Sequence, residues 1–210
     1  LDPRFALTVV KNGDEWPSNG AQKKVIETFM GGFNAAPKYG ATPTGYYLRK
    51  YVDGSCVTTA DNQVASRHTW IVFRLGEFYL SYAEALNEYY GTSGHAEALQ
   101  YLNAIRERAG IPAYEGTYTQ EQMRELIRRE RRIELLDEGK RYTDLRRWMI
   151  SKEVFAKPIR GLNVKATSDD AFFFTQRNFM TRSFEDRNYL WPIYQTYIDN
   201  NPKLVQNYGY

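Results

Sequence analysis

The sequence predicts a mainly α-helical protein of paired helices, with long irregular loops and a few short strands. Three observations support this fold class. Apolar residues recur at helical spacing between about residues 69 and 150. Glycine and proline are dense before this segment, and helical periodicity is lost after it. We expect a single domain over 1–210, with a loop-rich segment at 1–68, a helical core at 69–150 and an irregular segment at 151–210.

The composition excludes several classes of protein. The chain has 210 residues, of which 42% are hydrophobic, which is enough for a real core. A net charge of +3, with basic and acidic residues interleaved, does not favour nucleic acid as a partner. No apolar run reaches the roughly 18 residues of a membrane-spanning helix. Cys56 is the only cysteine, so an internal disulfide is excluded. The charged start, Leu1–Arg4, does not resemble a signal peptide, and we expect it to be internal to a longer protein.

The loop-rich segment contains two candidate strands. Residues Phe5–Val10 are enriched in β-branched side chains and are followed by a turn signal at 12–14. Between residues 16 and 45 the density of glycine and proline excludes a helix of any length. Tyr46–Val52 is the second candidate strand, with Asp53-Gly54 as its turn. A loop region of this length in a compact protein is more often functional than not.

The helical core should contain four helices in two antiparallel pairs. Apolar spacing predicts the first, and a capping box from Thr119 to Gln122 begins the third. The first pair is close to the length of a tetratricopeptide unit, but such arrays need about three units for stability, so we expect this chain to be a piece of a larger protein. After residue 150 we expect coil, including the C-terminus. The expected helices are 70–90, 95–109, 119–138 and 141–150.

The second half of the core carries an unusual charged block. The stripe that begins with Met123 and Ile127 is apolar and then continues into Glu130 and Glu134. A buried carboxylate without a partner costs several kcal/mol, so these two need cations. We expect a helix pair held by internal ion pairs; the alternative is a solvated charged face. The expected partners on the next helix are Arg141, Arg146 and Arg147.

Several segments together resemble the C-terminal portion of the SusD/RagB family of outer-membrane nutrient-binding lipoproteins. The segments Arg74–Glu88 and Asn103–Gly110 look like the family's first helix pair, and Glu130–Trp148 is similar to its most recognisable block. The tail, Leu190–Tyr210, and the start, Asp2–Phe5, also resemble family elements. The match covers most of the chain in the expected order. The tail departs from the family pattern at three tyrosines, namely Tyr194, Tyr197 and Tyr208.

The resemblance implies a fold of tetratricopeptide-like helix pairs, part of an α-α superhelix, and a non-catalytic role without a cofactor. Such a protein captures an oligosaccharide or a peptide at the surface of a Bacteroidetes-type cell. It passes the ligand to a SusC-like TonB-dependent transporter. Family members are lipid-anchored through an N-terminal cysteine, for which Cys56 is no substitute. Two other hypotheses remain open: a peptide-capturing member, and a helical-repeat module that binds only its transporter.

The shared helical motifs carry no ligand-binding residues, so candidates must come from the loops. Aromatic residues make up 15% of the chain, and a glycan binder needs flat aromatic faces with fixed donors and acceptors around them. The alternative is that these rings anchor the loops onto the helices. Our candidates are Trp16, Phe33, Lys38, Tyr39 and Tyr46, with Asn19, Phe29, Asn34 and Tyr47 beside them and a weaker set at Asp169, Asp170, Arg177 and Asn178.

The sequence does not favour a metal site or an enzyme. His68 and His95 are isolated from each other and from carboxylate clusters. Glu130 and Glu134 could in principle act as a glycosidase pair. Neighbouring arginines would lower the carboxyl pKa, which does not suit a protonated general acid. There is also no nucleophile elbow, phosphate loop or zinc-binding helix.

Overall fold

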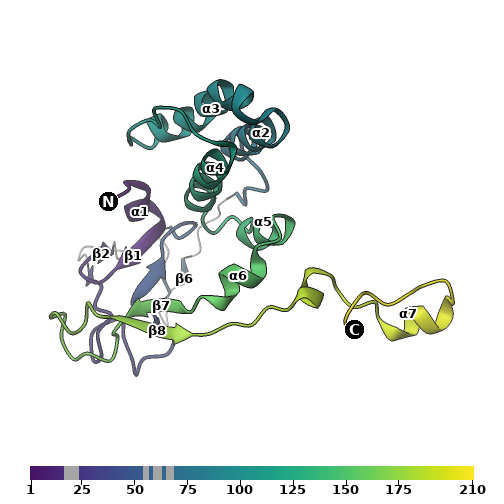
Figure 1. Cartoon of the computed structure of the whole chain (residues 1–210). Helices are drawn as coiled ribbons and strands as arrows, with labels where there is room; N and C mark the ends of the chain where they lie inside the picture. The colour runs from purple at the N-terminus through teal and green to yellow at the C-terminus, as the bar shows by residue number, and fades with distance from the viewer. Residues whose placement is uncertain (17–23, 54–56, 59–62, 65–68) are drawn as a thin grey trace.

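The computed structural model describes residues 1–16, 24–53, 57–58, 63–64 and 69–210. The helices α2, α3 and α4 form one part of the molecule, and short strands and loops form the other (Figure 1). The segment after β8 projects away from both parts, and α7 lies near its far end (Figure 1). Asn19, Gly54, Cys56 and His68, which entered the sequence predictions, lie outside the described residues.

The helical part confirms the predicted mainly α-helical class. It contains α2 (Leu75–Tyr90), the 3-10 turn η1 (Gly91–Gly94), α3 (His95–Arg108) and α4 (Gln120–Glu134). Both α3 and α4 pack against α2. Small side chains on the facing surfaces, Ala83 and Ala98, are fully buried and allow the α2 and α3 backbones to approach closely. The core consists of Leu80, Ala83, Leu86, Ala98, Leu102, Ile105, Met123, Ile127 and Leu135.

The start of α4 is as predicted, but its end is four residues earlier. The Thr119 hydroxyl accepts a hydrogen bond from the Gln122 backbone at 3.2 Å, and the Gln122 side chain accepts one from the Thr119 backbone at 2.9 Å. The helix ends at Glu134 because Asp137 and Gly139 have positive φ angles of 61° and 72°. This turn leaves Asp137 exposed and directs Glu138 into the protein.

Two short helices follow instead of the single one predicted over 141–150. Helix α5 spans Arg141–Arg147, and α6 spans Ser151–Ala156. The chain changes direction between them at Met149, whose φ angle is 56°. The apolar pattern alone did not reveal α6, because six residues are too few to show a helical period.

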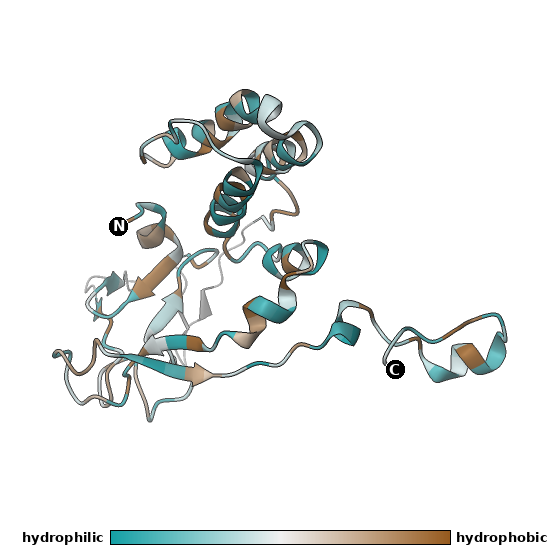
Figure 2. Ribbon diagram, viewed as in Figure 1, coloured by the Kyte–Doolittle hydropathy of each residue, from teal (hydrophilic) through white to brown (hydrophobic). Residues whose placement is uncertain are grey.

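The predicted strand at Phe5–Val10 is wrong in its first half. Residues Arg4–Thr8 form the helix α1, and only Val9–Lys11 form the strand β1. Just before the helix, the Asp2 side chain accepts a hydrogen bond from the Arg4 backbone N–H at 2.9 Å. The second strand, β4, is shorter than predicted and spans Tyr46–Leu48; it pairs antiparallel with β1. Figure 2 shows β1 as hydrophobic, and Val10 within it is buried.

The remaining strands form three further two-stranded ribbons. They are β2 (Glu15–Trp16) with β3 (Lys24–Val25), β5 (Val57–Thr58) with β6 (Gln63–Val64), and β7 (Ile159–Leu162) with β8 (Gln176–Met180). The β7–β8 hairpin packs on the early loops. A side chain at Gly161 would meet the Thr44 Cα at 2.6 Å, so only glycine permits this approach. Five apolar residues of this part are buried, namely Val10, Ile26, Ala35, Ala166 and Phe173.

The predicted coil at the C-terminus is interrupted by helix. The tail contains a 3-10 turn, η2 (Asp186–Tyr189), and a six-residue helix, α7 (Gln195–Asn200). The Gln206 amide closes the tail on itself by donating to the Ile193 carbonyl and accepting from the Ile193 N–H, both at 2.8 Å. No helix among the described residues is both long and apolar enough to span a bilayer.

A buried ionic cluster joins α4 to distant parts of the chain. Glu130 is fully buried and accepts hydrogen bonds from Arg4 at 2.6 Å and Arg106 at 3.0 Å. Glu134, one turn later, accepts from Arg4 at 3.0 Å, from Arg74 at 2.7 Å and from Arg108. The two carboxylates therefore hold α1, the start of α2 and the end of α3 in one network. Figure 2 shows α4 as mainly hydrophilic, although it lies between these segments.

Glu138 extends this cluster to the loop after β4. Its carboxylate accepts a hydrogen bond from Lys50 at 2.6 Å and several from Arg74, of which the shortest is 2.7 Å. Lys50 also donates to the Leu136 carbonyl at 2.8 Å. We call Arg4, Lys50, Arg74, Arg106, Arg108, Glu130, Glu134 and Glu138 the ionic cluster.

The arginines predicted as partners of Glu130 and Glu134 bind elsewhere. Arg147 pairs with Glu84 at 2.5 Å and Asp144 at 2.9 Å, which joins α5 to α2. Arg146 donates to backbone carbonyls of Asn188 and Tyr189 and so holds the base of the tail. Arg141 forms no ion pair with any described residue. The error arose because sequence proximity favoured α5, whereas the charged stripe of α4 faces α1, α2 and α3.

Removing one buried carboxylate should destabilise the protein strongly. In Glu134→Gln, the three guanidiniums around this position lose a charged partner, and we expect a loss of about 3–5 kcal/mol in the free energy of unfolding. Glu121→Gln is the matched control on the same helix, because the Glu121 side chain is 67% exposed; it should change stability by less than about 0.5 kcal/mol. Urea denaturation of both variants measures the change in the free energy of unfolding. Equal changes in the two variants would contradict the stabilising role of the ionic cluster.

The same carboxylates make stability depend on pH. Burial alone would raise the pKa of Glu134, but hydrogen bonds from Arg74 and Arg4 outweigh it and hold that pKa below the ordinary value. The stabilisation is complete above the unfolded-state pKa of about 4.3 and is lost as pH falls through the folded-state pKa. We expect the free energy of unfolding to decrease below about pH 5. In Glu134→Gln the free energy of unfolding should decrease less over the same pH range. An unchanged pH dependence in this variant would show that Glu134 is not the cause.

Candidate functional site

The loops before the helical part bring three of the predicted ligand-binding residues onto one surface. The β2–β3 pairing places Trp16 directly opposite Lys24. The Lys24 ammonium lies 4.6 Å from the centre of the Phe33 ring, and the Lys38 ammonium lies 4.4 Å from it. Trp16, Phe33 and Lys38 are therefore joined through Lys24. We call Trp16, Lys24, Phe33, Lys38 and Tyr39 the loop patch.

Phe33 has a different role in this surface from the one its sequence suggested. Two ammonium groups next to its ring are attracted by the ring electrons, so the ring holds two cations close together. Lys38 is fixed further by donating to the Phe33 carbonyl at 2.5 Å. The Phe33 backbone N–H donates to the Glu27 carboxylate at 2.9 Å, which anchors the loop. Phe33 thus positions hydrogen-bond donors more than it offers a bare face for stacking.

Tyr39 and Trp16 add ring surface next to these lysines, since Tyr39 follows Lys38 in the chain and Trp16 is opposite Lys24. The Tyr39 side chain is fully exposed and follows Lys38 in a turn that Gly40 completes with a φ angle of 77°. Trp16 is half-buried, and the Arg49 guanidinium lies 5.9 Å from its ring centre. An exposed ring beside fixed cations can stack on a sugar while the ammonium groups bind its hydroxyl or acidic groups.

Tyr46 lies on a different surface from the loop patch. It is opposite Lys11 in the β1–β4 ribbon, and its ring meets Phe5 edge-on at 6.4 Å. Successive side chains of a strand point to opposite faces, so Tyr47 points the other way. The Tyr47 hydroxyl donates to the Asn34 carbonyl at 2.5 Å, in the loop that carries Phe33. The structure therefore separates Tyr46 from the other predicted residues.

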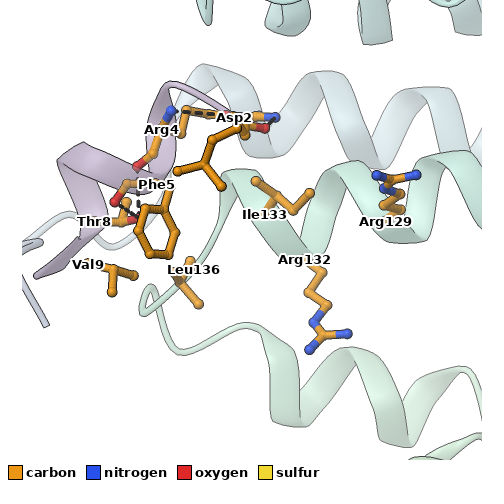
Figure 3. Close-up of a pocket in the computed structure, with 10 residues that line it drawn as sticks. Asp2, Arg4, Phe5, Thr8, Val9, Arg129, Arg132, Ile133 and Leu136 are labelled. Atoms are coloured by element: carbon orange, nitrogen blue, oxygen red, sulfur yellow. Dashed lines mark hydrogen bonds and ion pairs between the residues drawn. The ribbon is translucent and has the colours of Figure 1, made fainter. Parts of the chain in front are cut away.

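A pocket of about 470 Å³ lies on the Phe5 side, between α1 and α4 (Figure 3). In Figure 3, Phe5, Val9 and Leu136 gather at one end, and Arg129 and Arg132 lie farther along α4. Phe5 was not among the predicted site residues, because the sequence predicted a strand at this position. Lys24 was not among them either, since no local pattern indicates that a lysine will reach a ring nine positions later in an irregular loop.

The other residues considered from the sequence have structural partners or lie apart. Phe29 packs edge-on against the buried Phe173 at 6.3 Å, so it anchors its loop. Asp170 accepts hydrogen bonds from Ser168 and two backbone N–H groups, which lower its carboxyl pKa and close the loop after β7. Asp169 is exposed in that loop. Arg177 and Asn178 line a separate pocket of about 270 Å³.

Among the described residues, no group of three or more His, Cys, Asp or Glu side chains is arranged to hold a metal ion. His95 is buried, with its Nε2 2.9 Å from the Asn87 side-chain oxygen. The paired carboxylates Glu130 and Glu134 are covered by guanidiniums and are closed to a substrate.

Comparison with known proteins identifies the family. The model of the SusD family matches residues 1–210. A SusD-like protein of Formosa agariphila, P2, is 32% identical over 155 residues, which cover 70% of this chain and 27% of that protein. The crystal structure of a SusD-like protein from Bacteroides fragilis is 30% identical, with a TM-score of 0.78 over 100% of this chain and 39% of that one.

Two further solved structures are described by what they bind. A SusD-like carbohydrate-binding protein from Bacteroides fragilis is 28% identical, with a TM-score of 0.66 over 97% of this chain and 41% of that one. A surface glycan-binding protein A from Bacteroides thetaiotaomicron is 26% identical, with a TM-score of 0.50 over 91% of this chain and 33% of that one. The chain spans less than half the length of each of these relatives. With a family match along its entire length and the same fold, this chain belongs to the SusD family.

Proposed function

We propose that this chain is the C-terminal portion of a surface protein that binds oligosaccharide or polysaccharide nutrients without changing them. The protein would be lipid-anchored at the outer membrane and deliver its ligand to a SusC-like TonB-dependent transporter. Membership of the SusD family supports this proposal, as do the carbohydrate-binding and glycan-binding relatives. The observation that carries it in this chain is the loop patch, where an exposed ring adjoins two fixed ammonium groups.

The loop patch has the properties that sugar binding requires. Tyr39 provides an exposed ring on a turn, and its own conformational freedom is limited to two side-chain torsions. Lys24 and Lys38 provide donors that are already ordered on Phe33, so little side-chain entropy is lost when a ligand binds. Trp16 extends the surface with a second ring. Tyr46, by contrast, would contact only a ligand that also reaches the pocket beside Phe5.

Tyr39→Ala should weaken glycan binding by about tenfold, because it removes the most exposed ring of the patch. Tyr208→Ala is the matched control, since Tyr208 is 82% exposed in the projecting tail; it should leave affinity unchanged. Calorimetry against a panel of neutral oligosaccharides and peptides measures both. Saturable binding to peptides alone would favour a peptide-capturing protein. Unchanged small-ligand affinities in both Tyr39→Ala and Trp16→Ala would favour a module that binds only the transporter.

A further inference from the structure

A basic cleft lies between α4 and the α5–α6 segment, away from the loop patch. It has a volume of about 300 Å³. Seven charged side chains line it, and five of these are cationic: Arg128, Arg129, Arg132, Arg141 and Lys157. Two cations have local partners, because Arg128 pairs with Glu125 at 3.0 Å and Lys157 with Glu153 at 3.5 Å. The cleft therefore holds an excess of three guanidiniums.

These three guanidiniums have no carboxylate partner in the part of the chain that the structure describes. Arg129 and Arg132 are exposed, and Arg141 is half-buried at the start of α5. Burial and the nearby charges of Arg132 and Arg128 lower the pKa of Arg141. The other arginines of α4 are paired with carboxylates, for example Arg131 with Asp144 at 2.6 Å. Unpaired like charges around one cleft therefore distinguish this place from the rest of the helical part.

A second observation concerns Arg128, whose side chain is only 18% exposed. Its Nη1 donates to Glu125, and its guanidinium lies 5.0 Å from the Trp148 ring centre. Its Nε–H is buried and has no acceptor among the described residues. A buried donor without an acceptor is costly. Guanidinium groups are also well suited to two-point binding of an oxyanion.

We propose that this cleft binds an anionic oxygen group, such as a sulfate, phosphate or carboxylate, through Arg128, Arg132 and Arg141. This inference rests on the proposed function in one respect: the group would be an acidic substituent of the glycan ligand. The cleft adjoins the pocket beside Phe5, since Arg129 and Arg132 line both (Figure 3). A glycan with an acidic substituent could place its sugar face against Phe5 and its anion among the arginines.

The first test titrates the chain with inorganic sulfate, with chloride at matched ionic strength as the reference. We expect saturable binding that Arg141→Gln weakens by about tenfold. Arg132→Gln, at an exposed position that forms no ion pair with any described residue, should act in the same direction and serves if Arg141→Gln destabilises the fold. Arg160→Gln removes the same charge from an exposed position on β7 and should change the affinity less than twofold. No saturable binding, or an equal loss in Arg160→Gln, would overturn the proposal.

A second arm identifies the source of the anion. A sulfated oligosaccharide and its desulfated counterpart are compared on the same proteins. Tighter binding of the sulfated form, with the preference abolished by Arg132→Gln, would support the glycan substituent. Sulfate binding without any such preference would overturn the glycan as source. If inorganic sulfate binds but no oligosaccharide does, the proposed function fails while the anion site stands.

Discussion

The buried carboxylates of α4 and of the turn that follows it are the constraint on which the rest of this structure depends. Glu130, Glu134 and Glu138 are each at most 6% exposed, and each is surrounded by cations from other segments. Taking each of these carboxylates out of water costs several kcal/mol. The fold is therefore stable only when Arg4, Arg74 and the other cations of the ionic cluster are all in place. The positions of these charges, as well as the burial of apolar side chains, therefore determine how the loops pack against the helices. A misplaced loop would leave a carboxylate unpaired.

This cluster also explains where the candidate site lies. Arg4 attaches α1 to α4, and β1 follows α1 directly. The β1–β4 ribbon then presents Tyr46 toward the Phe5 pocket and Tyr47 toward the loop that carries Phe33. The loops that carry the loop patch contain little regular structure, so their position depends on these few fixed attachments. Lys50 provides another one, from the end of the ribbon to Glu138.

The sequence predicted the long periodic elements well and the irregular ones poorly, for physical reasons. Helices α2, α3 and α4 extend over 14 to 16 residues, enough for a 3.6-residue period and a capping box to be visible. Helices α1, α6 and α7 have five or six residues, too few for a helical period to be visible, and α1 is held by the tertiary contact of Arg4 with Glu130. For the site, aromatic content indicated Trp16, Phe33 and Tyr39, but only the folded loops show that Phe33 holds two lysines and that Tyr46 lies apart.

An ion pair between residues 126 positions apart, Arg4 and Glu130, couples the loop-rich part to the helical part. A double-mutant cycle on Arg4→Met and Glu130→Gln, measured by urea denaturation, tests it most directly. The bond between these side chains is 2.6 Å long and buried, so we expect a coupling free energy of about 2 kcal/mol. A coupling below about 0.5 kcal/mol would show that the two parts are held together by something else.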